Sequence, residues 1–223
     1  MALPVAPMAL PAADDDNGGK FTPQHVVDTH VRGKALQVVY TNDPVSVESS
    51  IQTMEQFLVE DKYQVVSFDL EYTMGRAGHD QKVVVAQLCM RHDALIYHYH
   101  LATRPCERFS RFINSSDYTV DTTNDLKALK VSGLKCPNLL NIRHHYKVWG
   151  CGKNKLNSLV DLASAIIDPY YVKMKEESKK DKNSWHNVWH ERLDEEHVKY
   201  VTKDAYTSYK MYMWIADMRN CLL

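Results

Sequence analysis

The order of hydrophobic and polar residues in the first half of the chain predicts a strand followed by a helix. The β-branched, apolar run Ala35–Thr41 predicts a strand. Apolar residues then recur at intervals of three and four over Val45–Val59, a spacing typical of an amphipathic helix. Asn42 or Asp43 can cap this helix, with Pro44 just inside it.

Three further apolar segments lie close together and predict a meander. Gln64–Glu71 and Val83–Met90 are runs of buried-strand character, and Ala94–Tyr99 follows after a turn that begins at Asp93. The loops between them are short and polar, so we expect three consecutive antiparallel strands.

The second half of the chain mixes short helices with short strands. The order predicts an α/β fold, a mixed sheet flanked by helices, with no internal repeat and no interior linker. The expected elements are a helix over Pro105–Ile113, a strand over Tyr118–Val120, a helix over Asp125–Lys130, a buried segment Leu139–Ile142, a helix over Leu156–Ile167, a charged loop or helix end over Lys173–Lys182, and a closing helix over Glu195–Met218.

The first 22 residues differ in composition from the rest. They are rich in Ala and Pro and end in an acidic, glycine-containing stretch without a basic leader pattern. We expect residues 1–22 to be a disordered tail and residues 23–223 to form one domain. The chain has no apolar run long enough to cross a membrane, and we expect a cytoplasmic or nuclear protein, or one found in both.

Charge and cysteine usage narrow the function classes. The formal net charge is −1 and the isoelectric point about 6.8, which argues against coating nucleic acid by bulk electrostatics but permits contact with a few phosphates. Five cysteines without a C-x-x-C pair indicate a reducing compartment and no zinc site, and Cys89 is expected to pack as a small hydrophobe. The eleven histidines include no H-E-x-x-H motif, which favours solvated or packing roles.

Two carboxylates at the inner end of the second predicted strand carry candidate chemistry. Asp69 and Glu71 are two residues apart, so a strand would project both from one face. Like charges on a buried strand are costly unless compensated, and Mg²⁺ or Mn²⁺ prefers such oxygen ligands. A chance Asp-x-Glu triplet among 28 acidic residues is the alternative.

Three more residues could join this pair. Asp125 is at the start of a predicted helix directly after a predicted strand, the position where α/β proteins place ligands. The alternative role for this acid is a favourable interaction with the helix dipole. Tyr200 and Asp204 are four residues apart and therefore share one face of the closing helix. They are either a functional pair or a packed tyrosine beside a solvated acid.

The ordered set Asp69, Glu71, Asp125, Tyr200 and Asp204 resembles the tyrosine branch of the DEDD (DnaQ-like) 3′→5′ exonuclease superfamily. The segment Leu193–Tyr206, preceded by Trp185 or Trp189, resembles the Werner-type exonuclease domain, including its short single-domain plant members. The resemblance runs from about Ala35 to Met218. Gln87 of the predicted strand Val83–Met90 and the pattern Asn124–Leu129 are also similar to that family.

The resemblance implies an RNase H-like exonuclease fold and a two-metal mechanism using Mg²⁺ or Mn²⁺. It implies that Asp69 bridges both ions, that Glu71 and Asp204 complete one site, and that Asp125 holds the other ion. Tyr200 would orient the attacking water. The expected substrate is the 3′ end of nucleic acid, preferentially single-stranded RNA or DNA. Assembly into a homo-oligomer is an open alternative.

One segment departs from the family pattern, and other functions stay open. The family often has a glycine-bearing approach to its second motif, where this chain has Asp121–Asn124. One alternative is a weakly active or inactive exonuclease-fold module that binds nucleic acid or a protein partner. Another is an unrelated metal-dependent phosphohydrolase acting on nucleotides. Tyr72 could stack on a base or pack in the core.

Overall fold

The computed structural model describes residues 21, 24–25, 33, 35–73, 81–115, 119–121, 126–140, 142, 159–177 and 188–221. In this part of the chain, seven strands form one mixed sheet in the order β1-β2-β5-β4-β3-β6-β7. The strands are β1 (Gln24–His25), β2 (Gln37–Thr41), β3 (Val65–Tyr72), β4 (Val83–Met90), β5 (Asp93–Tyr97), β6 (Thr119–Asp121) and β7 (Leu139–Leu140).

The predicted meander is confirmed, because β3, β4 and β5 follow one another as antiparallel neighbours. The remaining pairings of the sheet interior are parallel: β2 with β5, β3 with β6, and β6 with β7. The carboxyl ends of β2, β3, β5 and β6 therefore meet at one edge of the sheet, where α/β proteins place ligands.

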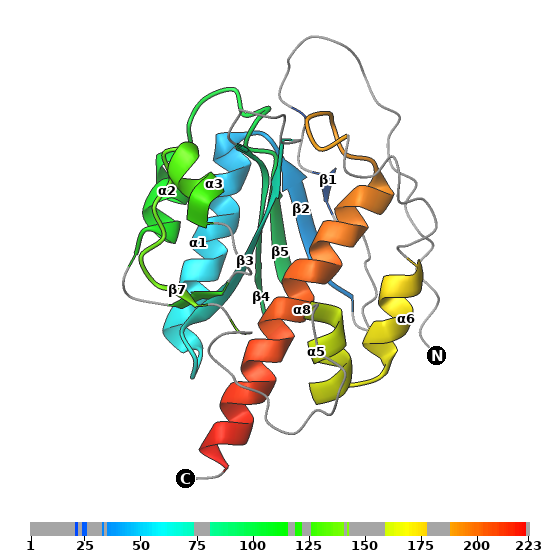
Figure 1. The fold of residues 1–223 in the computed structure, drawn as a ribbon. Helices are drawn as coiled ribbons and strands as arrows, with labels where there is room; N and C mark the ends of the chain where they lie inside the picture. Colours follow the sequence, from blue (N-terminus) through cyan, green and yellow to red (C-terminus); the bar gives the residue numbers. More distant parts are fainter. Residues whose placement is uncertain are drawn as a thin grey trace, which may run out of the picture.

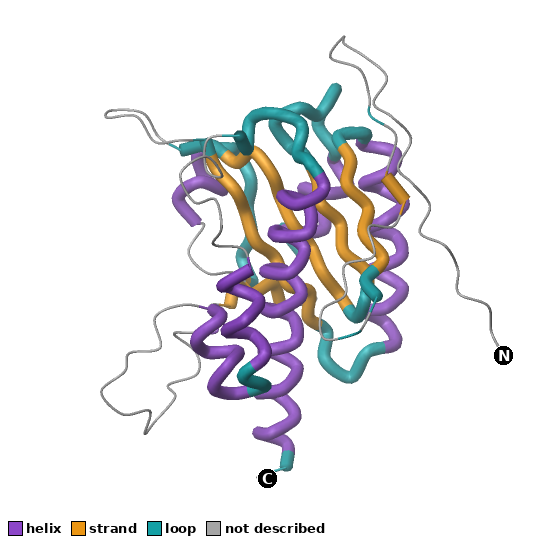
Figure 2. The backbone as a smooth tube through the Cα atoms, turned by 90° about the vertical axis from the view of Figure 1, so that its right-hand side faces the viewer, coloured by secondary structure: helices purple, strands orange, loops and turns teal. Residues whose placement is uncertain are grey.

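Helices cover both faces of the sheet (Figure 1). On one face lie α1 (Pro44–Glu60), α2 (Glu107–Ile113) and α3 (Leu126–Val131). On the other face lie α5 (Leu159–Ile166), α6 (Tyr170–Glu177) and the long α8 (Glu195–Asn220). Figure 2 shows α8 crossing in front of the strands, with α5 and α6 beside it. The predicted α/β architecture, a mixed sheet flanked by helices, is confirmed.

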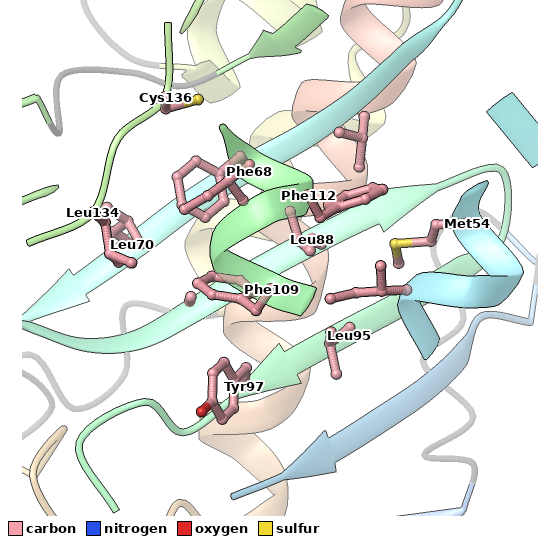
Figure 3. Packing of buried hydrophobic residues seen from close by; sticks show 14 of the residues in the cluster. Met54, Phe68, Leu70, Leu88, Leu95, Tyr97, Phe109, Phe112, Leu134 and Cys136 are labelled. Carbon is pink, nitrogen blue, oxygen red and sulfur yellow. The ribbon is translucent and has the colours of Figure 1, made fainter. Parts of the chain in front are cut away.

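Each face of the sheet has its own hydrophobic core. On the α1 and α2 side, Phe68 and Leu70 of β3 and Leu88 of β4 pack against Phe109 and Phe112 of α2 (Figure 3). On the α8 side, alternate residues of the same strands pack against the buried face of the closing helix. Because successive side chains of a strand point to opposite faces, one apolar run supplies both cores.

The predicted first helix is confirmed, but its cap works differently from the expectation. Asp43 occupies the N-cap position in extended conformation, yet its side chain makes no capping hydrogen bond. Asn42 is instead used between segments: its Oδ1 accepts from the Phe21 backbone N–H at 3.1 Å, and its Nδ2 donates to the Leu101 carbonyl at 3.0 Å.

Two details differ from the sequence expectations, and the charged segment agrees with one of its two alternatives, a helix end. β5 ends at Tyr97 rather than Tyr99, and the backbone turns at the buried His98. The charged segment begins as the end of α6, which runs to Glu177, and the rest of that segment lies outside the described residues. The short β1 was not predicted; two residues give no periodicity to read.

Cys89 is fully buried in the core beside α8, as predicted for a small hydrophobe. Of the predicted N-terminal tail, residues 1–22, only Phe21 lies within the described residues. None of the described helices combines the length and apolar character needed to cross a membrane.

Candidate active site

The alternation of β3 directs its two acidic side chains toward α8. Ser67, on the same face, has its Oγ 2.7 Å from the Ala205 carbonyl oxygen of α8 and 3.1 Å from the Cys89 carbonyl oxygen of β4. A hydroxyl has one proton, so Ser67 shares it between these two acceptors. The same face continues through Asp69 to Glu71, which places both carboxylates beside the first half of α8.

The start of α8 is fixed by a capping interaction. The Asp194 side chain accepts a hydrogen bond from the His197 backbone N–H at 2.9 Å, and His197 Nδ1 lies 2.7 Å from the same oxygen. Val198, Val201 and Ala205 are fully buried against the sheet. In this orientation Tyr200 and Asp204, which are one helical turn apart, are half-buried beside the contact between α8 and the sheet.

Tyr200 brings the predicted site residues together in one electrostatic environment. The negative charge of Asp204 is the largest cause of a raised Tyr200 pKa, followed by burial, by Glu71, by a hydrogen bond with Asp204, and by Asp69. Four of the five predicted residues, from β3 and α8, therefore lie within interacting distance. The phenol stays protonated well beyond neutral pH, so it can donate a hydrogen bond but cannot act as a base.

Asp125 lies outside the described residues, immediately before α3. Within the described ranges, no three His, Cys, Asp or Glu side chains form a ready-made metal site. The oxygen donors gathered around Tyr200 are nevertheless carboxylates, which are the ligands that Mg²⁺ and Mn²⁺ prefer, so the donor chemistry fits such ions.

A buried polar network that the sequence did not reveal holds the segment leading into α8. The Leu193 backbone N–H donates to Tyr40 Oη at 2.8 Å, and Tyr40 Oη lies 2.8 Å from His98 Nδ1. Because Tyr40 accepts from Leu193, we assign its proton to the bond with His98, which puts the imidazole proton on Nε2. Tyr40 and His98 are both fully buried.

Trp189, in that same segment, contacts the candidate site directly. Its ring centroid lies 6.3 Å from that of Tyr200 and 5.4 Å from that of His197, the latter in an edge-on arrangement. Trp189 is itself buried. The network of Tyr40 and His98 therefore positions the tryptophan against which the candidate tyrosine packs.

Of the two alternatives for Tyr72, stacking on a base or packing in the core, the structure shows core packing. Its side chain is half-buried and packs against the core on the α1 and α2 side of the sheet. That core contains Phe68 and Leu70, which alternate with Asp69 and Glu71 along β3, so it lies on the face opposite the two carboxylates. Tyr72 does not line the candidate site.

Comparison with solved structures identifies the fold. The EXO domain of Nibbler from Aedes aegypti superposes with a TM-score of 0.60 at 13% identity, covering 91% of this chain and 94% of that domain. The catalytic core of RRP6 from Trypanosoma brucei superposes with a TM-score of 0.57 at 13% identity, covering 90% of this chain and 52% of the RRP6 chain. RNase D from Escherichia coli, an exoribonuclease involved in structured RNA processing, superposes with a TM-score of 0.56 at 14% identity. This match covers 81% of this chain and 45% of the RNase D chain.

These neighbours are exonuclease domains of the DEDD type with a tyrosine in the last motif, so the RNase H-like exonuclease fold is confirmed. The chain spans about half the length of the RRP6 and RNase D chains. No family model matches the sequence, and no curated protein matches it.

Proposed function

From the fold that this chain shares with tyrosine-branch DEDD exonuclease domains, we propose that it is a divalent-metal-dependent 3′→5′ exonuclease. The proposed substrate is the 3′ end of single-stranded RNA or DNA. One observation carries the proposal: Asp69, Glu71 and Asp204 act together on the pKa of Tyr200, although β3 and α8 are far apart in the sequence. An unrelated role would not require these four side chains at one position.

Asp69, Glu71, Asp125 and Asp204 are the residues that would hold the metal ions in this proposal. Two bound divalent ions would activate water and stabilise negative charge on the phosphate. Asp69 and Glu71 lie on a strand whose apolar residues are buried, and Asp204 is on the helix that packs against that strand. Tyr200 contributes a neutral hydroxyl that can donate to, or accept from, the attacking water and so orient it.

Exposed basic residues that follow β5 or precede α8 are candidates for contacts to the nucleic-acid backbone. Arg192 is exposed, and its guanidinium lies 5.0 Å from the centre of the Phe21 ring. His100 and His190 are exposed and close enough to His98 to affect its pKa. Local contacts of this kind allow a chain of net charge −1 to hold a strand by a few phosphates.

The deciding experiment is digestion of end-labelled RNA and DNA, single- and double-stranded, with and without Mg²⁺ or Mn²⁺. We expect metal-dependent shortening from the 3′ end, abolished in Asp69→Ala. Asp217→Ala is a matched control, because this carboxylate is 63% exposed in its side chain and lies near the other end of α8. Equal digestion by Asp69→Ala and wild type would eliminate the proposal.

The second candidate function is an inactive exonuclease-fold module that binds nucleic acid. It predicts retention of the labelled oligonucleotide without shortening in every metal condition. A parallel incubation with free nucleotides separates both possibilities from a phosphohydrolase, which would act on the monomers. The residues gathered around Tyr200 favour the active enzyme, since binding alone needs no cluster of carboxylates at the sheet edge.

A further inference from the structure

Gln87, in the middle of β4, is a buried polar residue whose hydrogen bonds are missing. The residue has no exposed surface, and neither Nε2 nor Oε1 has a hydrogen-bond partner. An unpaired buried amide is costly, and such groups in folded proteins call for an explanation. A structural role would be served better by an apolar side chain in this strand, whose other residues are all hydrophobic and buried.

The strand register identifies the polar group within reach of this amide. Gln87 is directly opposite Asp69 in the antiparallel pair of β3 and β4, and opposite Ile96 on the other side. Opposed residues share a face with their Cβ atoms about 4.5–5.5 Å apart, so a glutamine with three rotatable bonds can reach the neighbouring carboxylate. Among the side chains that pack on this face, Val85 and Val201 are apolar.

We propose that Gln87 is a positioning residue: when a divalent cation is bound, its Nε2 donates to the Asp69 carboxylate and sets the orientation in which Asp69 holds the cation. This inference rests on the proposed function. The Oδ1 of Asp69 accepts from the Leu70 backbone N–H at 3.0 Å, and a carboxylate has about four acceptor positions, enough for the amide and a cation together.

The chemistry of an amide suits this position. A lysine or arginine opposite Asp69 would neutralise the carboxylate and compete with the cation. A glutamine supplies a donor without charge, so it orients the ligand and leaves the negative charge of Asp69, Glu71 and Asp204 available. Groups that hydrogen-bond to metal ligands typically contribute 10–100-fold to metal affinity or activity.

The test uses Gln87→Met, which keeps the side-chain length and removes both amide atoms. Mn²⁺ binding is measured by titration calorimetry on metal-free protein, with thermal unfolding of the same samples. We expect Mn²⁺ affinity to fall by about 10–100-fold. We also expect the metal-free protein to unfold at a temperature roughly 2–4 °C higher, because an unpaired buried group is removed.

Thr202→Val is the matched control. The Thr202 hydroxyl is also buried without a hydrogen-bond partner, but it is on α8 two residues before Asp204 and points away from it. This variant should gain stability with unchanged Mn²⁺ affinity. Gln87→Asn, which retains a shorter amide, provides a second variant and should weaken Mn²⁺ binding by about tenfold.

The outcomes separate the two proposals. If wild type cuts nucleic acid, Asp69→Ala does not, and Gln87→Met binds Mn²⁺ and cuts like wild type, only the role of Gln87 is overturned. A Gln87→Met protein that loses stability together with Mn²⁺ binding also overturns it, since the amide would then be structural. If neither wild type nor Asp69→Ala binds Mn²⁺ or cuts, both proposals fall.

Discussion

Acidification should weaken the fold through His98, and the structure sets the size of the effect. Burial is the largest cause that lowers the His98 pKa from 6.5 to about 4; the nearby His100 and His190 act in the same direction, and the Trp189 backbone opposes them. Between these two values the unfolded chain binds a proton that the folded protein does not. The free energy of unfolding therefore falls as the pH falls from 6.5 through 4.

The magnitude follows from proton linkage. The full difference in pKa corresponds to about 3 kcal/mol, and about 2 kcal/mol of it is lost by pH 5. At pH 7 and above this contribution is fully present. A loss of 2 kcal/mol is a large part of the 5–15 kcal/mol that typically separates folded from unfolded domains. Tyr40 and His98 also hold the Trp189–Leu193 segment, so the environment of Tyr200 should loosen over the same pH range.

Urea unfolding followed by circular dichroism at pH 7, 6 and 5 measures the effect. His98→Gln keeps an acceptor for Tyr40 but does not titrate, so its stability should depend less on pH by about 2 kcal/mol between pH 7 and 5. His92→Gln is the control, since this histidine is exposed and is not among the groups that shift the His98 pKa. Equal pH dependence in wild type and His98→Gln, or an NMR titration of His98 near 6.5, would refute the reasoning.

Four further predictions concern the site and its supports. Tyr200→Phe should lower kcat by up to about 100-fold with little change in oligonucleotide affinity, measured by single-turnover digestion and by anisotropy. Because the pKa of Tyr200 is raised above 10, wild type and Tyr200→Phe should have pH–rate profiles of the same shape between pH 7 and 10; a fall specific to wild type would contradict this. Ser67→Ala should cost about 1 kcal/mol and lower the unfolding temperature by roughly 2–4 °C in a calorimetric scan; no change would mean that the link from β3 to α8 contributes nothing. Arg192→Ala, made in the Asp69→Ala background, should reduce the dependence of log K on log salt by about 0.7 for single-stranded nucleic acid, and an unchanged slope would place Arg192 outside the binding surface.

The features predicted from the sequence are those that depend on local periodicity. Asp69 and Glu71 share a face because a strand alternates, and Tyr200 and Asp204 share one because a helix repeats every 3.6 residues. The meander followed from three apolar runs with short loops. Each of these statements needs only residues that are close together in the chain, and each agrees with the structure.

The features that the sequence did not reveal depend on residues far apart in the chain. Tyr40 and His98 are 58 residues apart, and Tyr40 and Leu193 are 153 apart, so no local pattern indicates that they bond. The position of Gln87 against Asp69 required the strand register, which apolar runs buried on both faces leave open. Asn42 or Asp43 was predicted to cap the first helix, but the Asn42 side chain bonds to Phe21 and Leu101, which are distant in the chain.

The bond from Ser67 to Ala205 has a consequence for protein synthesis. It joins two segments that are 138 residues apart, and the candidate tyrosine and its neighbouring aspartate are on the later one. A ribosome needs on the order of ten seconds to add that many residues. During this interval the emerging chain already has the β3 carboxylates but lacks the α8 residues that complete the proposed site. The proposed site therefore cannot be complete in a nascent chain until α8 has left the ribosome and docked on the sheet.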